Sequence, residues 1–122
     1  MPVLAIHHLS LLVSDTERAL GFYRDVLGLS VVERPELGFP GAWLAIGDKQ
    51  LHLLELPNPD PFEGRPDHVG RDRHLALTVQ GLDRLEIRLA QAEIPITRSK
   101  SGRDAIFCRD PDGNGVELIA AP

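Results

Sequence analysis

Two histidines and two glutamates recur in the same order in the two halves of the chain. His8 opens the run HLSLLV, His74 opens HLALTV, and each half ends with an apolar stretch that holds one acid, Glu55 or Glu117. Imidazole nitrogens and carboxylate oxygens suit one borderline divalent ion such as Ni, Zn, Mn, Co or Fe(II). The repeat therefore predicts a metal site built from four strands, with an open position for a small-molecule substrate.

Acid–base chemistry is the reaction type that these residues favour. A carboxylate beside a Lewis-acidic metal can accept a proton from a bound molecule. Glu117 lies within an apolar strand, where an unpaired acid is costly, and this favours a ligand role. Glu55 is less constrained, because an alternating strand can turn it to solvent.

Other histidines compete with these candidates. His7 has the opposite strand parity to His8, so the two rings point to opposite faces of a strand. His52 likewise has the opposite parity to Glu55, and it is the alternative ligand if Glu55 faces away from the site. His68 falls in a proline-rich segment and is expected to be solvated.

The elements that must position these residues form two modules of an α+β fold with the order β-α-β-β-β. In module one (residues 1–56), a Ser14-x-x-Glu17 capping box predicts a helix start and Gly28 its end. Residues 57–72 hold four prolines and two glycines, which predicts a linker. Module two (residues 73–122) repeats the order, with a strong turn at 110–113.

Composition excludes several classes of protein. The chain has 122 residues, enough for one domain, and a net charge of −5, which gives no general attraction to nucleic acid. The apolar runs are too short for a membrane span. The single Cys108 excludes an intrachain disulfide and a cysteine-rich zinc site. The start of the chain shows no secretory signal, so we expect a cytoplasmic protein.

Four runs make the chain similar to a known family: HLSLLVSD (8–15), FYRDVLGL (22–29), HLALTV (74–79) and DPDGNGVEL (110–118). With these runs the chain resembles the vicinal oxygen chelate superfamily, also called the glyoxalase/bleomycin resistance/extradiol dioxygenase superfamily. The resemblance implies a single domain in which two tandem βαβββ modules form a curved mixed sheet around a metal site.

The resemblance also implies roles for the candidate residues. His8, His74 and Glu117 match the three ligand positions common to most metal-dependent members, and Glu55 matches a fourth position that is acidic in bacterial-type glyoxalase I. The implied activity is that of a lactoylglutathione lyase-like enzyme, in which proton transfer next to a metal-bound carbonyl proceeds through an enediolate. Glu117 would be the base, with Glu55 a ligand and second base.

The resemblance gives less information about the substrate and the oligomeric state. No glutathione-binding set can be matched, although Arg98, Lys100 and Arg103 could hold an anionic group. The resemblance implies a homodimer whose sites are shared between subunits. The alternatives are an epimerase, a fosfomycin-modifying transferase, a ring-cleaving dioxygenase, or a metal-free binding protein of the bleomycin-resistance type.

Overall fold

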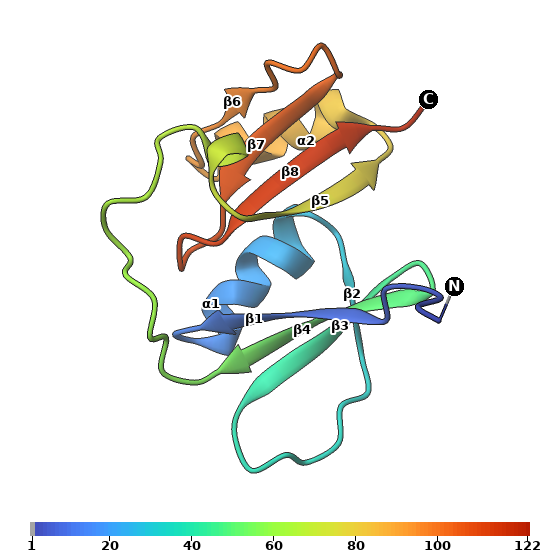
Figure 1. The fold of residues 1–122 in the computed structure, drawn as a ribbon, viewed down its shortest axis with the longest axis vertical. Coiled ribbons are helices and arrows are strands. Elements are labelled where there is room, and N and C mark those ends of the chain that lie inside the picture. The colour runs from blue at the N-terminus through green and yellow to red at the C-terminus, as the bar shows by residue number, and fades with distance from the viewer. Residues whose placement is uncertain (1) are drawn as a thin grey trace. The chain divides into compact units, whose positions relative to one another are not determined.

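The computed structural model describes residues 2–122 and confirms two βαβββ modules. The chain divides into two compact units, one ending at Pro59 and the other beginning at Asp60. The first unit contains β1 (His8–Val13), α1 (Thr16–Leu20) with a π-helical continuation (Gly21–Val26), β2 (Ser30–Val32), β3 (Gly41–Ile46) and β4 (Lys49–Glu55). The second contains a short 3-10 turn (Val69–Arg71), β5 (His74–Val79), α2 (Leu82–Gln91), β6 (Thr97–Arg98), β7 (Ala105–Arg109) and β8 (Gly115–Ala120) (Figure 1).

Each unit holds a four-stranded mixed sheet in which the first and last strands are neighbours. The strand orders are β1-β4-β3-β2 and β5-β8-β7-β6. β1 pairs with β4 in parallel, as β5 does with β8, whereas the remaining pairs are antiparallel. This order brings the histidine-bearing first strand of each unit directly against the last strand.

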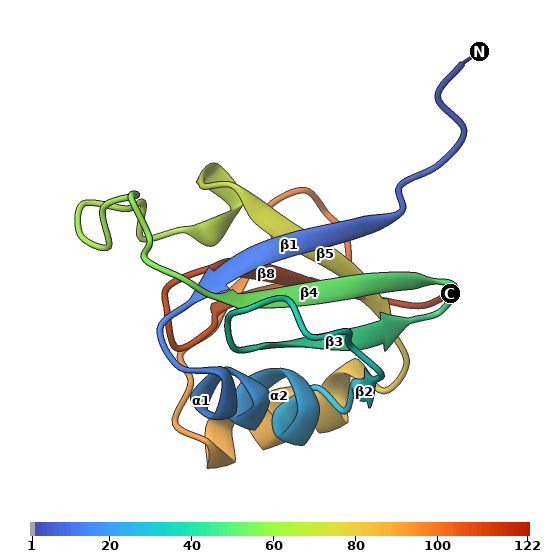
Figure 2. The same ribbon diagram turned by 90° about the horizontal axis from the view of Figure 1, so that it is seen from below.

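One face of each sheet packs into a hydrophobic core. In the first unit, Leu51 and Leu53 are fully buried, together with Phe22 and Tyr23 of the helical segment that lies along one side of the sheet (Figure 2). Burying each such side chain stabilises the fold by about 1.5–3 kcal/mol. Because side chains alternate along a strand, the other face carries His8 and its neighbours.

Helix α1 begins one residue later than the capping-box pattern predicts. Asp15, not Ser14, is the N-cap, and its Oδ1 accepts a hydrogen bond from the backbone N–H of Arg18 at 2.9 Å. Both residue types can cap a helix, so the sequence pattern alone does not fix which one does. The predicted end of the helical segment is confirmed, since Gly28 has φ +80°, a conformation that glycine adopts without steric cost.

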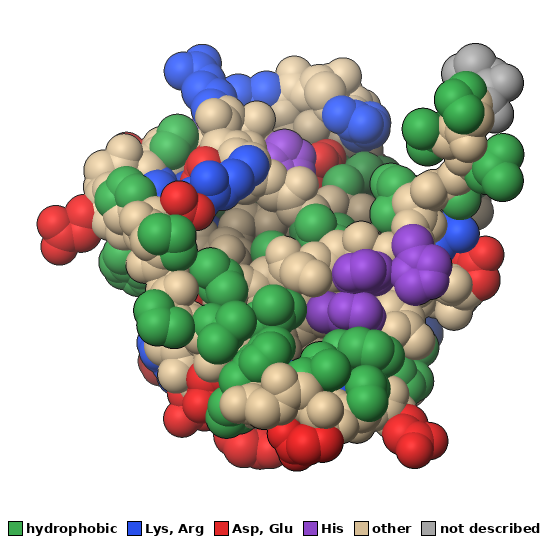
Figure 3. All heavy atoms as spheres, turned by 60° about the horizontal axis from the view of Figure 1, so that its bottom comes forward, with side chains coloured by type: hydrophobic (Ala, Val, Ile, Leu, Met, Phe, Trp, Pro, Cys, Tyr) green, Lys and Arg blue, Asp and Glu red, His purple; other side chains and the backbone are tan. Residues whose placement is uncertain are grey.

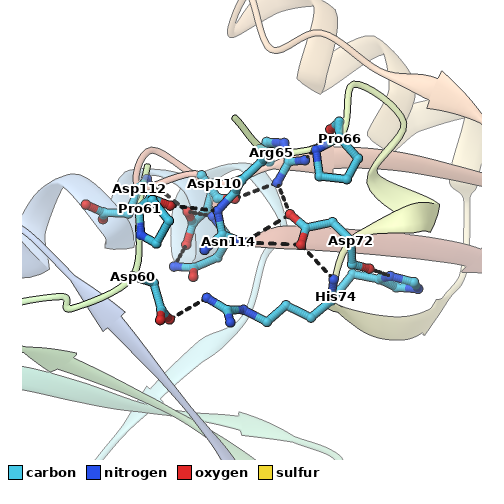
Figure 4. Close-up of polar contacts among 12 residues, drawn as sticks. Asp60, Pro61, Arg65, Pro66, Asp72, His74, Asp110, Asp112 and Asn114 are labelled. Carbon is cyan, nitrogen blue, oxygen red and sulfur yellow. Dashed lines mark hydrogen bonds and ion pairs between the residues drawn. The ribbon is translucent and has the colours of Figure 1, made fainter. Parts of the chain in front are cut away.

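The segment between the modules is more than a flexible linker, because its end is tied to the second unit. Asp72 accepts hydrogen bonds from Arg65 at 3.0 Å and from Arg109 on β7 at 2.9 Å (Figure 4). Arg109 also donates to the carbonyl oxygens of Pro66 and Gly113. Desolvation opposes ionisation of Asp72, but the hydrogen bonds from Arg109 and Arg65 outweigh it and lower the pKa of Asp72 to about 2.

The turn between β7 and β8 is built as the sequence predicts. The buried Asp110 accepts hydrogen bonds at its Oδ1 from the backbone N–H groups of Asp112 and Asn114, both at 2.9 Å. This arrangement fixes the start of β8 and therefore the register of the residues that follow. In residues 2–122, no helix is both long and apolar enough to span a bilayer.

We expect Asp72→Asn to lower the free energy of unfolding by about 1–3 kcal/mol at neutral pH, because hydrogen bonds to a charged carboxylate are lost. A carboxyl group with a depressed pKa stabilises the fold above its unfolded value of 3.8, and this contribution disappears as pH falls through about 2. Urea unfolding at several pH values should therefore show wild type and variant converging near pH 2. Asp67→Asn, an exposed position in the same segment, is the control, and a pH-independent difference would contradict the prediction.

Candidate metal centre

The second unit brings His74 and Glu117 together, as the repeat predicts. His74 opens β5, and Glu117 lies two residues beyond Gly115, the partner of His74 on β8. The Nε2 atom of His74 lies 3.1 Å from Oε1 of Glu117. Glu117 is only 3% exposed, and its Oε2 is buried without a hydrogen-bond partner among the described residues.

The hydrogen bonds of His74 place two hydrogen-bond acceptors next to each other in this pair. Its Nδ1 lies 2.9 Å from the backbone carbonyl of Asp72, which can only accept, so Nδ1 carries the proton. In a neutral ring, Nε2 then presents a lone pair to the Glu117 carboxylate. Two acceptors at this distance require a proton or a metal cation between or beside them, and an imidazole fixed through its other nitrogen is the usual form of a metal ligand.

The first unit gathers a cluster of histidines on the face of its sheet opposite the core. The rings of His8 and His52 stack with centroids 4.1 Å apart, and Trp43 stacks on His52 at 4.1 Å and 4°. His7 precedes β1, and its ring contacts His8 rather than pointing to the opposite face as predicted, with its Nδ1 2.9 Å from Nδ1 of His8. Histidine side chains gather in the same way in the space-filling view (Figure 3).

The strand registers show that His52 occupies the place that Glu117 has in the second unit. His8 pairs with Gln50, and His52 lies two residues further on; His74 pairs with Gly115, and Glu117 lies two residues further on. Each of the two residues also faces an aromatic partner on the adjacent antiparallel strand, Trp43 or Phe107. His52 is therefore the structural counterpart of Glu117.

Glu55, the fourth predicted ligand, does not lie beside His8 in this unit. Glu55 pairs with Val13, five residues along β1 from His8, and has the opposite parity to His52. Its Oε1 accepts hydrogen bonds from the backbone N–H of Thr16 at 2.8 Å and from the Thr16 hydroxyl at 3.1 Å. Glu55 thus caps the start of α1, where unpaired N–H groups and the helix dipole favour a carboxylate.

A signal for His52 is present in the sequence. His52 lies 44 positions after His8, against 43 positions from His74 to Glu117, whereas Glu55 lies 47 positions after His8. An expectation of the same residue type in both halves favours Glu55. The two halves carry different residue types at equivalent positions, however, and the closer match in spacing belongs to His52.

The surroundings of His52 favour its neutral form. Desolvation lowers its pKa from 6.5, and the charges of His8, His7 and Arg34 act in the same direction. Its Nε2 lies 2.8 Å from the side-chain oxygen of Gln50, an acceptor, so Nε2 carries the proton and Nδ1 holds the lone pair. A neutral, oriented imidazole is suited to bind a metal ion.

The remaining candidates have other contacts. His68 is half-buried rather than solvated, with Nδ1 3.2 Å from the Thr97 hydroxyl and its ring packed edge-on against Phe107. Arg98 forms an ion pair with Glu86, and Arg103 donates to the Ser101 hydroxyl at 3.1 Å. Lys100 is exposed. In the part of the chain that the structure describes, none of these three basic residues forms a hydrogen bond or ion pair with His74 or Glu117.

The donor atoms fit a divalent ion, and each unit holds one pair of candidate donors. Within residues 2–122, no group of three or more His, Cys, Asp or Glu side chains lies together in a geometry that could hold a metal. The pairs His8–His52 and His74–Glu117 offer nitrogen and oxygen donors of the borderline class. Cys108 offers none, since it is buried and burial raises the pKa of its thiol to about 12.

Comparison with known proteins defines the class. Residues 5–118 match the profile of the Glyoxalase/Bleomycin resistance protein/Dioxygenase superfamily, and the chain belongs to this superfamily. It is 30% identical to Glyoxylase I 4 of Arabidopsis thaliana over 120 residues, covering 93% of this chain and 69% of that protein. It is 32% identical to the lactoylglutathione lyase of Salmonella typhimurium over 123 residues, covering 93% and 90%. The structure of a lactoylglutathione lyase from Agrobacterium tumefaciens superposes with a TM-score of 0.66 at 28% identity, covering 99% and 96% of the two chains.

Relatives at similar identity carry different activities in their names. They include a methylmalonyl-CoA epimerase of Mus musculus and a glutathione transferase of Serratia marcescens. Among proteins of the same fold are a fosfomycin resistance protein from Listeria monocytogenes complexed with Mn(II) and an antibiotic binding protein from Streptomyces. Membership of the superfamily therefore leaves the reaction to be argued from the residues of this chain.

We expect Glu55→Ala to destabilise the fold without lowering metal content. The substitution removes the hydrogen bonds to Thr16 at the start of α1, a loss of about 1–2 kcal/mol for a helix cap. Urea unfolding measures the first effect, and elemental analysis of the purified protein measures the second.

The matched variant is His52→Ala, which we expect to reduce metal content because it removes a nitrogen donor beside His8. Loss of metal in Glu55→Ala with full retention in His52→Ala would reinstate the original ligand prediction.

Proposed function

We propose that the protein is a divalent-metal-dependent enzyme that moves a proton on a carbon next to a carbonyl group, as in lyases of the glyoxalase I type. The observation that carries the proposal is the His74–Glu117 pair. Its histidine is oriented by the Asp72 carbonyl, and its carboxylate is buried with one oxygen that has no hydrogen-bond partner among residues 2–122. A buried carboxylate without a full set of donors is unfavourable unless it binds a cation or exchanges a proton.

The proposed ligands are His8, His52, His74 and Glu117, with His52 replacing Glu55 in the set first predicted. Three imidazoles and one carboxylate favour Ni, Zn, Co or Fe(II) over a hard ion such as Mg. When bound, the ion would act as a Lewis acid toward a substrate carbonyl and would lower the energy of negative charge on its oxygen.

Glu117 is the base in this proposal. Its carboxylate accepts the proton from the hydroxyl-bearing carbon beside the carbonyl and returns it to the carbonyl carbon, while the hydroxyl proton passes to the former carbonyl oxygen, so the reaction is an isomerisation with no net loss or gain of atoms. For a thiol adduct of an α-oxoaldehyde, the product is a hydroxyacyl thioester. His74 holds its orientation through Asp72, and Glu55 has no part in the proton transfer.

The experiment begins with metal loading and elemental analysis. We expect the wild type to bind Ni or Zn, and His74→Ala to lose most of it. With methylglyoxal and glutathione as substrates, Glu117→Gln should reduce the rate by about 10²–10⁴-fold, the usual contribution of a general base. Glu63→Gln, an exposed position in the second unit, is the control. A wild type that takes up no metal and gains no stability from it would favour a binding protein instead.

The proposed assembly is a homodimer in which module one of one subunit and module two of the other complete each site. Two inactive variants, His8→Ala and Glu117→Gln, test it when they are unfolded, mixed and refolded together. Half of the randomly formed dimers are mixed and one of their two sites is intact, so the mixture should recover about a quarter of wild-type activity. Sites contained within one chain would give no recovery.

A further inference from the structure

Arg34 is a half-buried cation of the first unit that no acid neutralises among residues 2–122. It follows β2, whose Val32 pairs with Trp43, and Trp43 in turn pairs with His52. A Cβ atom added at Gly41 would lie 3.1 Å from Nη2 of Arg34. Gly41 opens β3 two residues before Trp43, so the guanidinium lies against the start of the strand that carries Trp43, the residue that stacks on His52.

The guanidinium is held in place by groups that leave its charge unmatched. Nη2 donates to the carbonyl oxygen of Phe39 at 2.9 Å, and the guanidinium carbon lies 5.0 Å from the centre of the Phe39 ring. Arg34 has no carboxylate partner among residues 2–122, and its Nε is buried there without an acceptor. The basic side chains Arg24 and Lys49 of the same unit are by contrast paired with Asp25 and Asp48.

A half-buried cation in such surroundings needs an anion. Trp43, Leu12 and Leu54 are half-buried on the His8–His52 face, and Arg34 is itself half-buried against the start of β3. An unpaired charge in this setting is unfavourable, and removal of that penalty by a ligand adds to binding. The planar fork of arginine matches the two oxygens of a carboxylate, and one positive charge balances one carboxylate better than a phosphate dianion.

We propose that Arg34 binds a carboxylate group of the substrate and thereby selects anionic substrates over neutral ones. This proposal rests on the proposed function, because the proposed function places the substrate on the His8–His52 face. It adds the substrate class, a carbonyl compound that carries a carboxylate, and it makes Arg34 a specificity-determining residue.

The test uses the fluorescence of Trp43, the single tryptophan of the chain, which lies on this face. Full-length protein is titrated with lactate and with lactamide, which differ in whether the end group carries a charge. The titration is repeated after EDTA treatment, so that a response independent of metal separates this proposal from the proposed function. We expect saturable quenching by lactate and a much weaker response to lactamide.

Three variants complete the design. Arg34→Met should weaken lactate binding by roughly tenfold to a hundredfold, the loss expected for charge-assisted hydrogen bonds. Arg34→Lys, which keeps the charge but not the fork, should recover part of the affinity. Lys49→Met removes the same charge from the β3–β4 hairpin and should leave affinity unchanged; circular dichroism verifies the fold of each variant.

Several outcomes would overturn the proposal. They are no saturable response to lactate, equal affinity for lactate and lactamide, and equal losses in Arg34→Met and Lys49→Met. Tighter binding of inorganic phosphate than of lactate, dependent on Arg34, would replace the carboxylate with a phosphate ligand.

Discussion

The parallel pairing of the first and last strands in each unit is the constraint on which the candidate site depends. Hydrogen bonds between β1 and β4, and between β5 and β8, fix which side chains lie side by side on one face. A shift of one residue in either register would send the histidine and its partner to opposite faces. The core supports the register, because Leu51, Leu53, Val116 and Leu118 are fully buried only when the alternate residues face the other way.

The same strand pairing explains which features of the fold and of the candidate site could be predicted from the sequence. The repeat, the hydrophobic alternation and the turn residues predict both modules, and the structure confirms their order. The pairing of His74 with Glu117 is also predicted correctly, because an acid within an apolar strand is conspicuous. The choice between Glu55 and His52 depends on register, however, and register is a tertiary property that alternation alone does not determine.

Local interactions account for the other differences between the predicted and the observed structure. Ser14 and Asp15 are both good helix caps, and only the backbone path selects Asp15. The segment 57–72 has the composition of a loop, but Arg65 and Arg109 converge on Asp72 from positions 7 and 37 residues away. Contacts at such separations leave no periodic signal in a sequence. The sequence does not single out Arg34 for the same reason, since the groups around its side chain are brought together only in the folded sheet.

The replacement of a carboxylate by His52 also changes the electrostatic balance of the proposed centre. Two histidines and two glutamates would neutralise a divalent ion completely. Three neutral imidazoles and one glutamate would leave such an ion with one net positive charge, which strengthens its attraction for an anionic oxygen and lowers the pKa of bound water. The charge of Arg34, which no acid matches among residues 2–122, would add to this attraction from within the same unit as His52, in a chain whose overall charge is −5.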